Sequence, residues 1–460
     1  MSRCYAETRV ELRRDPLLTA AALAASGLHG EYLVHEGPSE WSYGGGALAT
    51  LTLDREGARL SHDDDGGDDD GTFLPWDGPP LDSVRALLAR VPVEGWRAYG
   101  WAAFELSYAT GGAREHLGAE RLVHLVVPRT EIRFTATAAT VRAADEAGLA
   151  AAVEALDSPA PPLRSARPLP PGALGAGRAE YTAAVEATVR DIADGRLQKS
   201  ILSRAVDVPG DIDMIGTYVL GRRANTPARS FLLDLGGIEA AGFSPETVVE
   251  VTGDGLVTSQ PLAGTRALTD DPGRNGALRE ELLTCPKEVH EHAVSVKAGV
   301  DELADVCEPG SVAVSEFMAV RERGSVQHLA SRVTGRLSGP YGPWDAFGAV
   351  FPAVTASGIP KSAAYEAIRR HEPGRRGLYS GAVLVADHSG ALDAALVLRS
   401  VFRAAGRTWL RAGAGVVSQS SADREFEETA EKLRSVSGFL VPSAAAQDPA
   451  GPPLAGSLAR

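Results

Sequence analysis

The chain has 460 residues, of which 46 are Lys or Arg and 60 are Asp or Glu, so its formal net charge is −14. A hydrophobic share of 44% and a charged share of 23% are typical of a globular protein with a sizeable core. The acidic balance argues against a nucleic acid or an anionic membrane as partner, because phosphate binding requires a surplus of Lys and Arg.

The first predicted element is a soluble helix over residues 17–28. Asp15 is its expected N-cap and Pro16 its expected first residue. The stretch follows two arginines, as an export signal does, but it is short and Ala-rich. No run of about 18 apolar residues occurs, so no membrane span is expected. The three cysteines are widely spaced, which favours a reducing cytosol and a cytoplasmic location.

Three composition shifts divide the rest of the chain. Residues 62–71 hold six aspartates among glycines; they lack the spacing of a calcium loop, and a solvated hairpin tip is the favoured interpretation. Residues 158–177 are rich in Pro and Ala and predict a linker between an N-terminal part, 1–157, and a catalytic region, 178–442. The tail, 443–460, is predicted to be disordered.

After the linker, helix and strand signals alternate. Apolar residues from Tyr181 to Ile192 repeat at helical spacing, and Asp387–Gly390 lies between two apolar runs as a hairpin turn does. The predicted strands are 199–208, 230–234, 247–251 and 392–402. Hairpins imply antiparallel sheet, so the fold class is α+β. No glycine-rich phosphate motif follows a strand, and nucleotide binding has no support.

The first candidate site lies on two acidic helices. Pro286 is expected to open a helix that carries Glu288 and Glu291 on one face. Ser420 and Asp423 are expected to form a capping box for a second helix. On that helix, Glu425, Glu428 and Lys432 share one face. Carboxylates from two facing helices suit Mg²⁺, but Glu at this spacing is also routine on solvated helix faces.

The second candidate is a lysine and a glutamate in strand contexts. Lys199 shares one strand face with Ile201 and Ser203, so it must be paired or have a lowered pKa; a neutral lysine is a competent base. Glu246 follows a turn and opens a strand, where it is placed to act as an acid. An ordinary Lys–Glu ion pair is the alternative.

The third candidate is a set of small-residue loops beside a cation. The segments 264–265, 355–358 and 413–415 offer backbone N–H groups that a carboxylate can approach closely. Arg399, in a predicted strand, suits a bidentate carboxylate clamp, and Tyr379 offers a hydroxyl to the same group.

Ten motifs in order resemble those of the salicylate synthases, which are chorismate-utilising enzymes. They are RLQKSILSR, FSPE, QPLAGTRAL, KEVHEHAVSV, RERGSVQHLAS, FPAVTASGIPK, RGLYSGAV, LDAALVLRS, GRTWLRAGAG and REFEETAEKL. The similarity is dense from about residue 195 to 440 and weaker upstream. It implies one large α+β domain with two packed antiparallel sheets surrounded by helices.

The resemblance also implies the reaction and its residues. Lys199 activates water for attack at C2 of chorismate, Glu246 protonates the departing C4 hydroxyl to give isochorismate, and pyruvate then leaves in the same site. We group His328 with this catalytic pair. Mg²⁺ is the implied cofactor. The implied metal residues are Glu291 and Glu428, with Glu288 and Glu425 completing the acidic shell. The implied substrate-binding residues are Gly264, Thr265, Thr355, Tyr379, Leu398, Arg399, Gly413 and Lys432.

Rival functions remain open from sequence. An isochorismate synthase uses the same Lys199 and Glu246 pair, an ammonia-using anthranilate synthase would need an amidotransferase subunit, and an inactive relative would only bind chorismate. We expect salicylate formation for siderophore biosynthesis, no obligatory amidotransferase, and a monomer or weak homodimer. Four clustered glutamates repel one another, so without metal we expect a partly open site.

Overall fold

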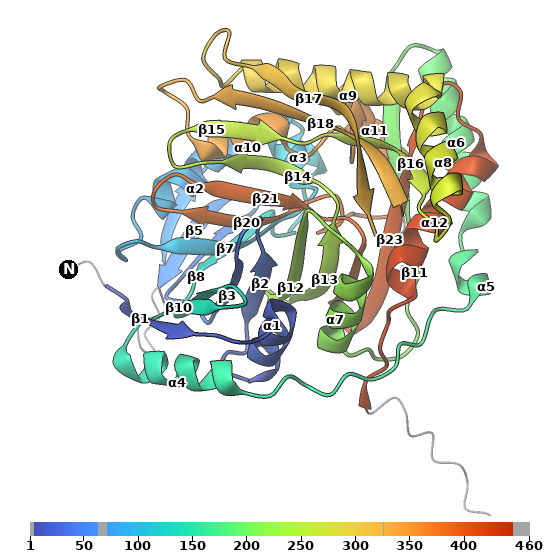
Figure 1. Cartoon of the computed structure of the whole chain (residues 1–460). Helices are drawn as coiled ribbons and strands as arrows, with labels where there is room; N and C mark the ends of the chain where they lie inside the picture. Colours follow the sequence, from blue (N-terminus) through green and yellow to red (C-terminus); the bar gives the residue numbers. More distant parts are fainter. Residues whose placement is uncertain (1–3, 63–70, 325, 445–460) are drawn as a thin grey trace, which may run out of the picture.

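Two large antiparallel sheets with helices on their outer sides make up the computed structural model, which describes residues 4–62, 71–324 and 326–444 (Figure 1). The predicted hairpin tip and the predicted tail lie almost entirely outside these residues. The strands on either side of the acidic run, β5 and β6, pair with each other. The α+β class expected from the hairpin signals is confirmed.

The first sheet has eleven strands, and every neighbouring pair is antiparallel. In spatial order they are β1 (Ala6–Glu11), β10 (Ala138–Ala143), β9 (Thr130–Phe134), β3 (Trp41–Gly45), β2 (Tyr32–Glu36), β12 (Arg229–Leu235), β13 (Ile238–Ser244), β22 (Ser400–Ala404), β23 (Arg407–Val416), β11 (Lys199–Asp207) and β19 (Gly358–Ile359).

The second sheet has twelve strands and is also antiparallel throughout. Along its main path they are β16 (Leu262–Ala267), β18 (Val326–Arg336), β15 (Leu256–Ser259), β14 (Thr247–Val251), β21 (Leu392–Leu396), β20 (Ala382–Asp387), β7 (Arg97–Ala102), β8 (Val123–Val127), β4 (Ala49–Leu53), β5 (Gly57–His62) and β6 (Thr72–Pro75), while β17 (Ala313–Arg323) pairs with β18.

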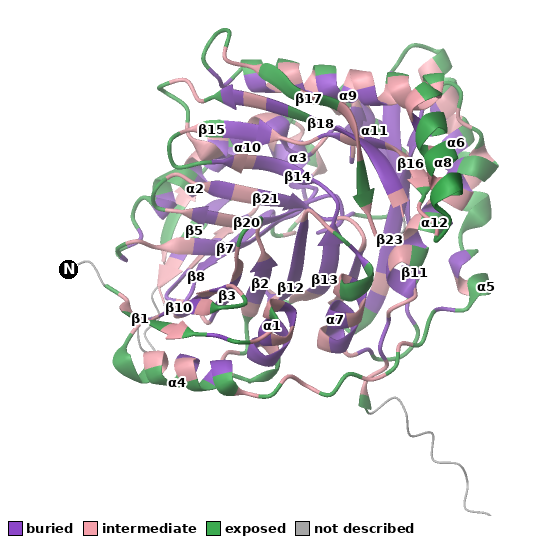
Figure 2. Cartoon of the chain, viewed as in Figure 1, coloured by how far each residue is buried: buried purple, intermediate pink, exposed green. Residues whose placement is uncertain are grey.

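Helices cover the outer faces of the two sheets (Figures 1 and 2). They are α1 (Pro16–Ala25), α2 (Pro80–Leu88), α3 (Leu106–Thr110), the 3₁₀ turn Arg114–His116, α4 (Glu146–Asp157), α5 (Pro171–Leu174), α6 (Arg178–Ala193), α7 (Met214–Ala224), α8 (Pro272–Thr284), α9 (Pro286–Ala304), α10 (Pro343–Val350), α11 (Lys361–His371) and α12 (Ala422–Ser437). Within the described residues, none of these helices is both long and apolar enough to cross a bilayer.

Large apolar side chains fill the space between the sheets. Leu33 and Phe231 from the first sheet join Tyr99 and Trp101 from the second in one buried cluster. Each sheet contains strands from both sides of residues 158–177. The proposed division of the chain at this segment stays a prediction.

Several predicted elements are confirmed. The first helix begins at Pro16, and the Asp15 carboxylate accepts the N–H of Leu17 at 2.9 Å. The helix expected from Tyr181 onward is α6, the strand expected at 199–208 is β11, and the hairpin at 387–390 joins β20 to β21. The helix with the first acidic pair begins at Pro286, as expected.

Two local predictions are wrong. The single strand expected at 392–402 is two strands, β21 and β22, which belong to different sheets. The chain breaks at Arg399, whose φ of 50° lies in the left-handed region and ends strand geometry. The capping box is also wrong, because α12 has Ser421 as its N-cap, without a side-chain capping bond. The Ser420 hydroxyl instead accepts the N–H of Val417.

Candidate active site

One cavity gathers nearly all the predicted site residues from distant parts of the chain. Its walls come from the start of β11, the turn before β14, the strands β16, β18 and β23, and the helices α9 and α12. The predicted residues that line it are Lys199, Glu246, Gly264, Thr265, Glu288, Glu291, His328, Thr355, Tyr379, Leu398, Arg399, Gly413, Glu428 and Lys432. The exception is Glu425, which is buried on α12 and does not line the cavity.

Lys199 is almost completely buried at the start of β11, with 1% of its surface exposed. Its ammonium lies 2.9 Å from Glu291 Oε1 and donates to Ser295 Oγ at 3.3 Å. Both partners belong to α9. Of the two states that burial permits for a lysine, the structure shows the paired one.

Glu246 is held in the turn before β14 with 3% of its surface exposed. The hydroxyl of Thr355 donates to its Oε1 at 2.6 Å. Removal from water raises the pKa of Glu246 to about 8, although the Thr355 hydrogen bond and the charge of Lys199 both act to lower it. At neutral pH the carboxyl therefore carries a proton that it can give to a leaving group.

Each of the four predicted site glutamates on α9 and α12 forms an ion pair with a lysine or an arginine. The ion pairs are Lys199–Glu291 at 2.9 Å, Arg266–Glu288 at 3.0 Å, Lys287–Glu425 at 3.0 Å and Lys432–Glu428 at 2.9 Å. These ion pairs offset the mutual repulsion of the four glutamates, and the partly open site stays a prediction. Sequence reasoning did not identify Arg266 and Lys287, although each lies within one of the quoted motifs.

The pKa values of the two α12 glutamates move in opposite directions. Burial would raise the pKa of Glu428, but Lys432, Lys287 and Arg424 together outweigh burial, and the pKa lies below its ordinary value. Burial raises the pKa of Glu425 and the charge of Glu428 raises it further, although Lys287 acts to lower it. The Oε2 atom of Glu425 is buried without a hydrogen-bond partner.

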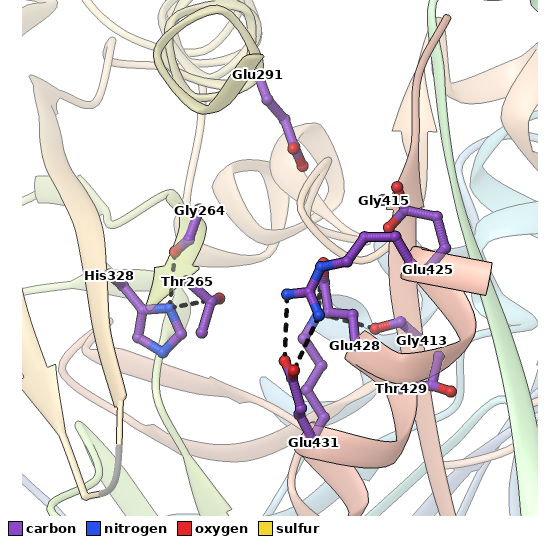
Figure 3. A network of polar contacts seen from close by, with 12 residues as sticks. Gly264, Thr265, Glu291, His328, Gly413, Gly415, Glu425, Glu428, Thr429 and Glu431 are labelled. Atoms are coloured by element: carbon purple, nitrogen blue, oxygen red, sulfur yellow. Dashed lines mark hydrogen bonds and ion pairs between the residues drawn. The ribbon is translucent and has the colours of Figure 1, made fainter. Parts of the chain in front are cut away.

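The carboxylates of Glu291 and Glu428 are the candidate ligands for Mg²⁺. Glu291 extends from α9 toward the side of α12 that carries Glu428 (Figure 3). A Cβ atom at Gly415 would lie 2.7 Å from Glu291 Oε1, so a glycine is needed to admit this carboxylate. Among the described residues, no group of three His, Cys, Asp or Glu side chains is arranged to hold a metal. Mg²⁺ requires only one or two carboxylates and keeps several waters, so the Glu291 and Glu428 pair fits it chemically.

His328 and Arg399 form a hydrogen-bonded pair on β18 and in the β21–β22 connection. Because arginine has only donors, Arg399 Nη2 donates to His328 Nε2 at 2.6 Å, and the ring proton is on Nδ1. Nδ1 in turn donates to the Gly264 carbonyl at 3.0 Å, beside the Thr265 hydroxyl (Figure 3). Burial and the charge of Arg399 hold the pKa of His328 well below its usual range. The imidazole is therefore neutral.

Arg399 remains a cation in spite of its burial, which lowers its pKa to about 10. Its Nη1 donates to the carbonyl of Arg323 at 3.3 Å, so part of its donor capacity is used within the protein. The predicted bidentate carboxylate clamp stays a prediction.

Gly413 and Tyr379 lie against each other in the cavity wall. A Cβ atom at Gly413 would lie 2.8 Å from the Leu202 carbonyl and 3.0 Å from the Tyr379 hydroxyl, so no larger residue fits. Lys432 donates to the Gly413 carbonyl at 2.9 Å. Sequence reasoning also did not identify Arg411, which lines the cavity two residues before Gly413.

The comparisons with known proteins agree with one another. The sequence profile of a family described as chorismate binding enzyme matches residues 50–438. A salicylate synthase of Mycolicibacterium paratuberculosis is 41% identical over 93% of this chain and 94% of its own length. An anthranilate synthase component 1 of Haloferax volcanii is 38% identical over 56% of this chain and 50% of its own length.

Solved structures show the same fold. The menaquinone-specific isochorismate synthase of Escherichia coli superposes with a TM-score of 0.72 at 20% identity, over 95% of this chain and 96% of that one. Anthranilate synthase component I of Streptococcus pneumoniae gives 0.69 at 24% identity, over 87% and 93%.

Proposed function

The chain belongs to the chorismate-binding enzymes, and from this premise we propose that it converts chorismate into salicylate and pyruvate through isochorismate. The observation that carries the proposal is a base and an acid on one cavity: a buried lysine, Lys199, and a glutamate, Glu246, that is protonated at neutral pH. The similarity to a salicylate synthase over nearly the full length of both chains favours the complete reaction over its first half.

In the first step, two hydroxyl groups exchange across the ring. Lys199 must first release to solvent the proton of its ion pair with Glu291. Its neutral Nζ then accepts a proton from water as the water oxygen bonds to C2. Both ring double bonds shift, the C4–O bond breaks, and Glu246 gives its proton to the departing hydroxyl, which leaves as water. The Thr355 hydroxyl holds the carboxyl of Glu246 in place for this transfer. The product is isochorismate.

The second step is a problem of positioning. The hydrogen on C2 passes to the methylene carbon of the enolpyruvyl group while the ether bond at C3 breaks, which releases pyruvate and leaves an aromatic ring. No strong base is needed if both carboxylates are held so that the two carbons meet. We assign the enolpyruvyl carboxylate to Tyr379, Arg399 and the Gly413 backbone.

We propose Mg²⁺ as the cofactor, with Glu291 and Glu428 as the residues that would hold it and Glu288 and Glu425 nearby. When bound, the ion supplies positive charge for the ring carboxylate of the substrate. Lys432 and Arg399 add local positive charge in a protein whose net charge of −14 repels a dianion.

We propose further that the enzyme acts in the cytoplasm, without an amidotransferase subunit, as a monomer or weak homodimer. The water-using mechanism supports the absence of that subunit, because an amidotransferase is needed only where ammonia is the nucleophile.

The test is an incubation of the purified protein with chorismate and Mg²⁺, with and without EDTA. We expect salicylate fluorescence and pyruvate in equal amounts, and loss of both with EDTA. Isochorismate without pyruvate would identify an isochorismate synthase instead, and ammonium-dependent anthranilate would identify an anthranilate synthase.

A further inference from the structure

A buried cluster of three charged residues lies beside Tyr379 in the wall of the cavity. Glu372 caps the C-terminus of α11, Arg376 follows in the next connection, and Arg411 is on β23. All three are buried. The cluster holds two guanidinium groups and one carboxylate, and a further buried carboxylate, Glu105, accepts the backbone N–H groups of Arg376 and Gly377.

The Glu372 carboxylate is the centre of the cluster. Its Oε1 accepts from Arg376 Nη2 at 2.5 Å and from the backbone N–H and hydroxyl of Ser203 at 2.7 and 3.0 Å. Its Oε2 accepts from Arg376 Nε at 3.0 Å and from Arg411 Nη2. Burial would raise the pKa of Glu372, but the two arginines outweigh it, and the carboxylate is ionised.

The two arginines connect the cluster to segments that line the cavity. Arg376 donates to the carbonyls of Ile201 and Ala356 at 2.6 and 2.7 Å, and both residues are part of the cavity wall. Arg411 donates to Ser203 Oγ at 2.8 Å and itself lines the cavity. Loss of one hydrogen bond in the cluster therefore affects the wall at several points.

The arginines also hold the ring of Tyr379. Their guanidinium carbons lie 5.8 Å (Arg376) and 5.5 Å (Arg411) from its centroid, and Arg376 lies 4.5 Å from the ring of Phe104. A cation within about 6 Å of a ring is attracted to its face. Both cations therefore contact the ring of Tyr379, whose hydroxyl lies close to Gly413.

Stability alone gives no reason for such a cluster. Removing charges from water costs so much free energy that a buried ion network often stabilises a protein no better than apolar residues of the same volume. Two buried guanidinium groups in and beside the wall of a cavity proposed to bind a dianion point to a role in binding.

We propose that Glu372, Arg376 and Arg411 are positioning residues for the carboxylate-binding end of the cavity. Glu372 holds the two arginines, the arginines orient Tyr379, and Arg411 adds one positive charge beside the substrate. This inference rests on the proposed function, in which Tyr379 contacts the enolpyruvyl carboxylate.

The first test is Arg411→Met, with KM, kcat and melting temperature measured for chorismate. We expect KM to rise by about tenfold, because Tyr379 loses a cation over its ring and the substrate loses a nearby positive charge, with kcat changed by less than about threefold. Arg407→Met is the matched control, because Arg407 lies on the same strand but pairs with Asp207 at 2.7 Å on the exposed surface. A lower melting temperature with an unchanged KM would overturn the proposal.

Glu372→Gln separates geometry from charge. The change makes the cluster more positive, so KM falls if charge alone matters and rises if the arginines must be held in place. We expect a rise, and partial recovery in Glu372→Asp. If Glu372→Gln does not fold, Arg411→Lys replaces it as the test, since lysine keeps the positive charge but lacks the planar guanidinium donors. Its KM is expected to lie between those of wild type and Arg411→Met.

The wild-type protein separates the two ideas under test. No salicylate from wild type would reject the proposed function itself. An active wild type whose KM is insensitive to the Glu372 and Arg411 variants would reject only the positioning role.

Discussion

At the scale of single residues, burial decides which side chain acts as acid. Glu246 lies in a closed turn where the cost of holding a bare carboxylate exceeds the help of Thr355 and Lys199, so the carboxyl keeps its proton. The sequence predicted the residue from its place after a turn. It could not predict the protonation state, because Thr355 is 109 residues further along the chain.

This pKa leads to a prediction for pH dependence. The acid must be protonated, so the rate of the first step is expected to fall as pH rises through about 8. Glu246→Gln is expected to lower kcat by roughly 10²–10⁴-fold, as for loss of a general acid, and to remove this descending limb. Steady-state rates of salicylate formation between pH 6 and 9 check both. A wild-type rate in the variant would mean that the acid is misassigned.

The same group makes a prediction for stability. Between the ordinary value of 4.5 and about 8, the folded protein keeps a proton that the unfolded chain releases. The free energy of unfolding is therefore expected to fall, through this group, as pH rises across that window. Urea unfolding at pH 5 and pH 8 should show a smaller difference for Glu246→Gln than for wild type; an equal difference contradicts the assignment.

Lys199→Ala tests the base. We expect no water addition to chorismate, with the fold kept, because the small cavity left behind is next to an existing one. Lys297→Ala is the control, since Lys297 lies on α9 but is exposed and pairs with Asp301. Salicylate and isochorismate are both measured by chromatography. Turnover at the wild-type rate in Lys199→Ala would reject the role of this amine.

At the scale of elements, helices and hairpins were predictable where the signal is local. Asp15 caps the first helix and Pro16 begins it, so two adjacent residues are enough to predict its start. The turn between β20 and β21 is likewise predicted by the four consecutive residues 387–390. The break at Arg399 was not predictable, because residues 391–403 contain no Gly or Pro to mark it while the chain passes from one sheet to the other. The basic partners of the acidic helices were missed since they come from other elements, as Arg266 of β16 does for Glu288.

The facing of α9 and α12 leads to a prediction about metal. Glu291→Gln is expected to weaken Mg²⁺ binding, because one of the two cavity carboxylates proposed to hold the ion loses its charge. Calorimetric titration of Mg²⁺ measures the affinity without turnover. Glu431→Gln is the control, since Glu431 lies on α12 but pairs with Arg424 on the surface. An unchanged affinity in Glu291→Gln would exclude this residue as a ligand.

At the scale of the whole molecule, the two parts of the chain share both sheets. The N-terminal part meets the C-terminal part where β2 pairs with β12 in the first sheet and where β7 pairs with β20 in the second. Composition placed a linker at 158–177 but gave no sign of these pairings, because the strands that meet are nearly 200 residues or more apart. The cavity itself is built from residues after the linker.

We therefore expect that residues 178–442 do not form a stable enzyme when expressed alone. Removing the N-terminal part would leave β12 and β20 as long apolar edge strands, which aggregate. A single cut within 158–165 of the complete protein is expected to leave both pieces associated and active, because the pairings do not depend on that connection. Size-exclusion chromatography and salicylate formation check both. A soluble, active 178–442 fragment would show that the catalytic region folds independently and that its half of each sheet is sufficient.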